Sequence, residues 1–240
     1  MSKTTKGNNL IREILVSISF DGDISVQTLE ERVKKSTLIN ETFKKTHDAF
    51  STSIKFDPAD SKSKTGRVGF VLQSKKDQRI ILQLKTGMIS YHMLDQYVPS
   101  NEFADLFQKY WSAIVGDENI IPKELTIRYV NFIPVEDEEK LSDVITLKVE
   151  HPYENVENEF YNAKFYKNDL PVNIVIAYEG NKENRGAFFD HSIKQKFNKE
   201  DKEKVSNLEQ IISQLRPIKN DIFFKILTEK TKNKYFNGIS

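Results

Sequence analysis

Residues 68–135 read VGFVLQSKKDQRIILQLKTGMISYHMLDQYVPSNEFADLFQKYWSAIVGDENIIPKELTIRYVNFIPV, and this stretch decides the fold. Its apolar alternation predicts a strand over residues 67–74, closed by a lysine-rich turn. A second strand is predicted to start at Arg79. Gly87 interrupts that strand, which indicates a bulge or a tight bend before the strand resumes.

An amphipathic helix is predicted after Pro99-Ser100, because large apolar side chains recur there at helical spacing. They form one stripe: Phe103, Phe107, Tyr110, Trp111 and Ile114. In isolation such aromatic residues resemble a base-stacking set, but their spacing favours a helix packed on a sheet. A further strand is predicted over residues 125–135.

The same patterns extend to both sides of this stretch. A capped helix is predicted after Ser25, and a helical segment with a kink at Pro217 ends the chain. Further strands are predicted over residues 14–20, 49–56, 144–149, 159–166, 172–178 and 187–193.

These elements predict an α+β fold: a mainly antiparallel, strongly curved sheet of about nine strands, with helices packed on one side and a C-terminal helical segment. We divide the chain into residues 1–135, a strand meander with the aromatic helix inserted, and residues 136–240, a second meander with the C-terminal helices. The two halves are expected to form one compact unit.

Composition indicates a globular protein. Of the 240 residues, 38% are hydrophobic and 30% are charged, which is enough apolar material for a core. The absence of cysteine excludes disulfides, Cys-ligated zinc and thiol catalysis. No segment has the length of a membrane span or the form of a secretory signal, so a cytoplasmic protein without a membrane partner is predicted.

The net charge is +1, but residues 194–234 hold 11 basic and 6 acidic residues. This excess hints at an anionic partner, although lysine-rich solvated helix faces explain it more simply. The four histidines have no metal-ligand spacing, and no phosphate loop or nucleophile motif is present. We therefore predict no metal and no cofactor, assign no catalytic residue, and favour a binding protein over an enzyme.

Arg128 is the most unusual polar residue, because it lies in the middle of a predicted strand. The alternation puts Leu125, Ile127 and Tyr129 on the opposite face, so Arg128 should lie on the face without helices. A guanidinium on a concave sheet face can bind a carboxylate or a phosphate. The alternative is a structural pair with an acid on a neighbouring strand.

Four other residues are candidate ligand-binding groups. His92 and Lys85 could reach the same concave face from a neighbouring strand. Asn131 breaks the apolar pattern of the Tyr129 face. Asp190 lies inside a strand, where a buried carboxylate requires a partner.

The chain also resembles a known group of proteins. The segments that carry the resemblance are Val68-Gly69-Phe70-Val71, residues 79–84 with Gly87, the helix with Phe103 and Tyr110, Ile127-Arg128-Tyr129-Val130-Asn131, Phe188-Phe189-Asp190, and residues 215–228. Together they resemble a sporadically distributed bacterial family of uncharacterised proteins. Met88, Phe107 and Ser192 depart from the family pattern, which more often has an aromatic residue, a tryptophan and a second aspartate there. The departure at Ser192 argues against a two-carboxylate metal site.

The resemblance implies no settled activity. The patchy distribution of the family implies an association with bacterial defence or toxin–antitoxin-like modules. Our first hypothesis is a non-enzymatic binding or regulatory protein whose partner is another protein. The resemblance suggests that it is the partner subunit of such a module. Two alternatives remain: an enzyme or sensor that binds a nucleotide or phosphate ester through Arg128, and a nucleic-acid binder that uses the basic C-terminal helices. The sequence leaves the oligomeric state open.

Overall fold

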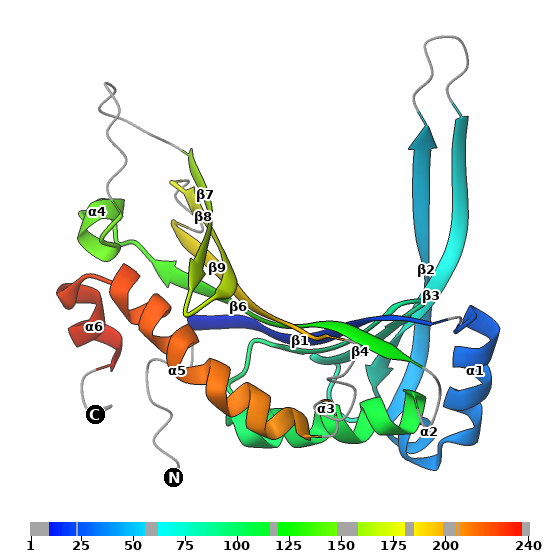
Figure 1. The fold of residues 1–240 in the computed structure, drawn as a ribbon. Helices are drawn as coiled ribbons and strands as arrows, with labels where there is room; N and C mark the ends of the chain where they lie inside the picture. Colours follow the sequence, from blue (N-terminus) through cyan, green and yellow to red (C-terminus); the bar gives the residue numbers. More distant parts are fainter. Residues whose placement is uncertain are drawn as a thin grey trace.

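A computed structural model describes nearly the whole chain as one open sheet with helices beneath it (Figure 1). The described residues are 10–22, 24–55, 62–115, 120–147, 158–180, 185–198, 205 and 207–236. The strands are β1 (Ile11–Asp21), β2 (Phe43–Lys55), β3 (Lys62–Ser74), β4 (Ile80–Lys85), β5 (Met88–Leu94), β6 (Ile121–Pro134), β7 (Asn158–Lys167), β8 (Leu170–Glu179) and β9 (Gly186–Lys196). The helices are α1 (Val26–Lys35), α2 (Thr37–Thr42), α3 (Ser100–Val115), α4 (Leu141–Val144), α5 (Leu208–Ile226) and α6 (Glu229–Phe236).

The nine strands pair antiparallel in the order β2-β3-β4-β5-β1-β6-β9-β8-β7. β1 and β6 occupy the centre, and each begins a similar half of the chain. In both halves a strand is followed by helix, then by a meander whose last strand returns to pair with the first, then by a long helix. This topology divides the halves between α3 and β6, which is earlier than the division after residue 135 expected from the sequence pattern.

Two projecting hairpins give the molecule its shape. The β2–β3 hairpin rises at one end of the sheet and the β7–β8 hairpin at the other, both on the side opposite the long helices (Figure 1). β4 pairs with β3 only from Gly69 to Gln73, so the outer part of the β2–β3 hairpin extends beyond the rest of the sheet. The sheet face between the hairpins is therefore flanked by two arms.

The core lies between the sheet and α3 and α5, which contact each other beneath it. In β1, alternation puts Ile14, Val16 and Ile18 on the helix side, each completely buried. The predicted stripe of α3 is buried against this layer. Trp111 meets Phe20 of β1 edge-on, with ring centroids 5.7 Å apart.

Polar contacts fix the helix ends. Ser25 caps α1 by accepting a hydrogen bond from the backbone N–H of Thr28 at 3.0 Å, as predicted from the sequence. Arg32 donates to the carbonyl oxygens of Ile114 and Val115 at 2.6 and 2.7 Å. These carbonyls belong to the last turn of α3, so the guanidinium satisfies acceptors that have no partner within the helix.

The structure confirms the predicted fold class: α+β, antiparallel, an open curved sheet, and C-terminal helices. Of the two alternatives at Gly87, the structure has the tight bend: this residue, with φ of +90°, lies in the turn that reverses β4 into β5, which are two antiparallel strands. One local prediction was wrong. The strand predicted over 144–149 begins instead in α4, and Ile145 makes only an isolated bridge to Leu227; residues 148–149 lie outside the described part.

The first prediction concerns Gly69, where β3 passes close to β4. A Cβ at this position would lie 2.0 Å from the carbonyl oxygen of Leu84, which is backbone and cannot rotate away. Gly69→Ala should therefore separate the strands and lower the free energy of unfolding by about 2 kcal/mol or more, measured by chemical denaturation. Gly66→Ala is the matched control, because no atom lies within 4 Å of its Cβ position. Equal midpoints for the two variants would contradict the close approach.

Candidate functional site

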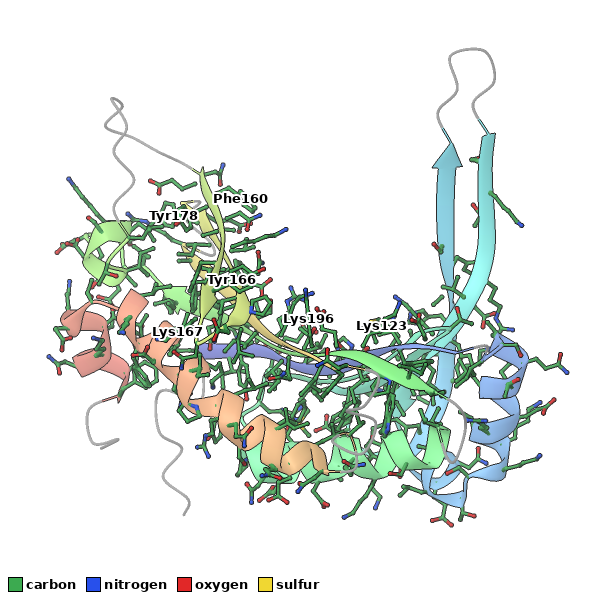
Figure 2. The ribbon with its side chains drawn as sticks, viewed as in Figure 1. Lys123, Phe160, Tyr166, Lys167, Tyr178 and Lys196 are labelled. Carbon is green, nitrogen blue, oxygen red and sulfur yellow. The ribbon has the colours of Figure 1, made fainter. Side chains whose placement is uncertain are left out.

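The candidate site is the sheet face that α3 and α5 do not cover, here called the uncovered face. Its central residues alternate with the buried core residues of the same strands. They are Glu13, Leu15, Ser17 and Ser19 of β1; Ser90, His92 and Leu94 of β5; Glu124, Thr126, Arg128, Val130 and Phe132 of β6; and Phe188, Asp190, Ser192, Lys194 and Lys196 of β9. Figure 2 shows Lys123 and Lys196 on this side of the sheet, between the two arms.

Arg128 lies at the centre of the uncovered face and is paired. Its Nε and Nη2 donate to the two carboxylate oxygens of Asp190 at 2.9 and 2.7 Å, which is a bidentate geometry. Its Nη1 lies 3.6 Å from Oε2 of Glu13. The hydrogen bonds that Arg128 donates to Asp190 raise the pKa of Arg128. The guanidinium thus joins β6 to a strand on each side, β9 and β1.

The network continues from Glu13 to β5. His92 Nδ1 lies 2.7 Å from Oε1 of Glu13, and His92 Nε2 lies 2.9 Å from Oγ of Ser90. Since a carboxylate only accepts, Nδ1 carries the proton that His92 donates to Glu13. This hydrogen bond, with the charge of Arg128 assisting, holds the pKa of Glu13 below its usual value even though partial burial acts in the opposite direction.

The order Ser90–His92–Glu13 has the atom pairing of a serine hydrolase triad, with hydroxyl on Nε2 and carboxylate on Nδ1. Two further requirements are not met. Ser90 is only 1% exposed, so its hydroxyl cannot reach an acyl substrate. β5 is also paired on both sides, with β4 and β1, which engages the backbone N–H groups that an oxyanion hole would need. The geometry therefore favours a structural polar ladder.

The structure brings together three of the five predicted ligand-binding residues. Arg128, Asp190 and His92 belong to one network, linked through Glu13. Sequence reasoning missed Glu13, although it alternates with Ile14 at the start of β1 and lies diagonal to both Arg128 and His92. The available signal was an acid immediately before the alternating pattern of residues 14–20, in phase with its polar positions.

The other two predicted residues lie elsewhere. Lys85 is on the uncovered face, at the end of β4, where it pairs with Met88. His92 pairs with Ile81, near the other end of β4, so Lys85 is distant from it. Asn131 is 4% exposed on the helix-packed side of β6, as the alternation predicted, and is therefore separated from Arg128 by the sheet. Neither is part of the network.

A second unusual group of residues lies beneath the sheet. His191 is 1% exposed, and its ring stacks on Phe189 with centroids 4.7 Å apart; neither ring nitrogen has a hydrogen-bond partner. Burial and the charge of Lys219 lower the pKa of His191. Nζ of Lys219, from α5, lies 3.8 Å from the ring centre of Tyr129, and burial lowers the pKa of Lys219 to about 7. His191 and Lys219 thus lie between α5 and the sheet, where burial disfavours the charged form of both side chains.

In the described part of the basic C-terminal region, Lys194, Lys230 and Lys234 pair with acids that are distant in sequence. On α6, Lys230 and Lys234 pair with Glu139 and Glu136 of the loop before α4. Arg185 holds that loop by donating to three of its carbonyl oxygens at 2.7–2.8 Å. These ion pairs weigh against a phosphate-binding surface on the C-terminal helices.

No protein-family model matches the chain, and no curated protein shows detectable similarity to it. Within the described residues, His, Asp and Glu side chains nowhere gather in a group of three that could hold a metal ion. Among the described helices, none has the length and apolar character required to cross a membrane.

The second prediction tests whether Arg128 is a structural residue. Arg128→Met leaves Glu13 and Asp190 close together without their shared cation. Because these groups are partly exposed, the loss should lie between that of a surface pair and a buried pair, about 1–2 kcal/mol in the free energy of unfolding. Lys194→Met is the control: Lys194 is equally exposed (40% against 39%) but makes only a single contact with Glu124. Equal stability of the wild type and Arg128→Met would contradict a structural role for Arg128 and would leave its guanidinium as a candidate ligand-binding group.

The third prediction concerns pH. The folded-state pKa of Glu13 is lowered, so its contribution to stability is fully present above the unfolded-state pKa and disappears as the pH falls through the folded-state pKa. Glu13→Gln should therefore be less stable than wild type at neutral pH, and the difference should shrink below about pH 4. Denaturation midpoints measured between neutral and acidic pH test this. A constant difference across the whole range would contradict the pairing.

Proposed function

We propose that this chain is a non-enzymatic binding protein whose uncovered sheet face receives another protein. The observation that carries the proposal is the one-sided arrangement of the fold: long helices cover one face, and the other, flanked by two arms, is left without a covering element in the described chain. The solvated face of an antiparallel sheet commonly carries mainly polar side chains. This one also carries apolar side chains, among them Leu15, Val130 and the contacting rings of Phe132 and Phe188.

The chemistry of the face supports a protein partner over a nucleic acid. Apolar patches surrounded by charged and hydroxyl groups are typical of protein interfaces. The carboxylates of Glu13, Glu124 and Asp190 lie among the basic groups and neutralise them, which would repel a phosphate backbone. A nucleotide is also disfavoured, since the fork of Arg128 already holds Asp190.

The network gives the face a fixed form. Its side chains are held by cross-strand ion pairs before any partner arrives, so little conformational entropy remains to be lost on binding. The family resemblance implies a setting for this activity: the chain would be the partner subunit of a bacterial defence or toxin–antitoxin-like module, acting in the cytoplasm.

The fourth prediction tests this function with Val130→Lys. Val130 is the direct register neighbour of Glu13 on one side and of Asp190 on the other, so a lysine there meets two acids and should not unfold the sheet. It puts a charge in the middle of the proposed interface. Affinity for the cognate partner, measured by calorimetry with the wild-type full chain as reference, should fall at least about tenfold.

Leu38→Lys is the matched control, because Leu38 is an exposed leucine (42%) of α2, outside the uncovered face. It should leave affinity unchanged. The partner is sought first as the product of a neighbouring gene. If the bound species is instead a nucleic acid whose affinity falls steeply with salt, or if both variants bind like wild type, the proposal is wrong.

A further inference from the structure

The edge strand β7 displays an unusual set of aromatic residues. Four of the seven exposed large hydrophobic side chains in the described chain lie on it: Phe160 (72%), Tyr161 (36%), Phe165 (37%) and Tyr166 (74%). Phe160 and Tyr166 are on the uncovered side and Tyr161 and Phe165 on the other, by their pairing with β8. Figure 2 shows Phe160 and Tyr166 on the arm that β7 forms with β8. Both surfaces of this one edge are thus apolar.

The two edges of the sheet are protected differently. β2, at the opposite edge, pairs with β3 through two register shifts and carries Lys44, Lys45 and Asp48, which are common devices against strand addition. β7 pairs with β8 in an unbroken register from Asn158 to Lys167. A long, regular and aromatic edge is a template for another strand.

The turn after β7 determines which backbone groups face that open edge. Asn168 and Asp169, both with positive φ, make a two-residue turn, so Lys167 and Leu170 close the hairpin with hydrogen bonds. Alternation then directs the N–H and C=O groups of every second residue outward. These residues are Phe160, Asn162, Lys164 and Tyr166.

The sequence of β7 complements itself when read antiparallel about Ala163. In that register Phe160 faces Tyr166 and Tyr161 faces Phe165, so aromatic residues meet on both surfaces of the sheet. Asn162 faces Lys164, which avoids two like charges. The pairs Phe160–Tyr166 and Asn162–Lys164 consist of residues whose backbone groups point outward. The same register therefore pairs the N–H and C=O groups that β8 leaves open.

We propose that two copies of this chain associate through antiparallel pairing of their β7 strands, with Ala163 facing its own counterpart on a twofold axis. The two sheets then continue into each other across the interface. A second copy is the occupant because the pattern is complementary to itself; a strand from a different protein would require no such symmetry. The inference goes beyond the proposed function and does not rest on it.

A charge swap tests both the dimer and its register. The wild-type full chain should sediment at twice 27.9 kDa. Asn162→Lys opposes lysine to Lys164 at two symmetric places, which should weaken the dimer about tenfold. Adding Lys164→Asn restores an Asn–Lys pair at each place and should recover wild-type affinity. The double variant has the same amino-acid composition and net charge as the wild type, so only the pairing is tested. Phe50→Ala, at an exposed aromatic residue (63%) of the other edge, should have no effect.

Cysteine cross-linking provides an independent measurement, since the chain contains no cysteine. Ala163→Cys should form a disulfide-linked dimer on mild oxidation, because the two thiols meet at the axis. Tyr161→Cys is the control, since each such thiol faces Phe165 and not its own counterpart. A wild-type chain that sediments at 27.9 kDa at every accessible concentration, a dimer that the double variant fails to restore, or a cross-link that forms equally well at both positions would each overturn the proposal.

Discussion

The antiparallel pairing of β1 with β6 is the contact on which the rest of the structure depends. Each strand begins one half of the chain, and each is joined on its other side to the last strand of its own meander. Val16 and Ile127, more than a hundred residues apart, are direct partners at the centre. Closing so long a loop costs entropy, which the burial of apolar side chains on the helix side of both strands must offset. The ion pairs of Arg128 with Glu13 and Asp190 lie at this junction.

The network around Arg128 follows from covering the sheet on one side only. Side chains that alternate with the core must face solvent or one another, and on the four central strands they include acidic residues, basic residues and a histidine. Pairing Arg128 with Glu13 and Asp190 avoids an isolated half-buried charge, which would cost more than the pair contributes. The network is therefore better understood as an ordered surface than as a set of reactive groups.

Features that depend on local spacing were predictable from the sequence, and features that depend on neighbouring strands were less so. The buried stripe of α3, the Ser25 cap and the face of Arg128 follow from periodicity and capping, and the structure has them. The residues that pair with Arg128 depend on which strands lie beside β6. The spacing of residues within one segment of sequence does not reveal those neighbours. Gly87 shows the same limit, because a glycine inside an apolar run is compatible with a bulge or with a reversal.

The charge of a segment in the sequence can differ from the charge of its surroundings in the folded structure. Residues 194–234 look like a basic region, yet Glu136 and Glu139, from a loop far earlier in the chain, bind two lysines of α6. These two pairs therefore hold α6 against that loop and reduce the electrostatic field of the local excess. The buried histidine of β9 is surrounded by Phe189 of its own strand and by rings from β6 and α5, so its neighbours in sequence account for only part of its environment.

The proposed dimer and the proposed binding face are compatible because of the parity of the β7 register. Directly opposed residues of antiparallel strands lie on the same face. Pairing about Ala163 matches even-numbered residues with even-numbered ones, so Phe160 and Tyr166 of both copies lie on the side of their uncovered faces. A register centred between two residues would oppose each even-numbered residue to an odd-numbered one, whose N–H and C=O groups already point toward β8, so the two edges could not form hydrogen bonds. The self-complementary register is thus one that leaves both uncovered faces pointing in the same direction, where a symmetric or elongated partner could contact both at once.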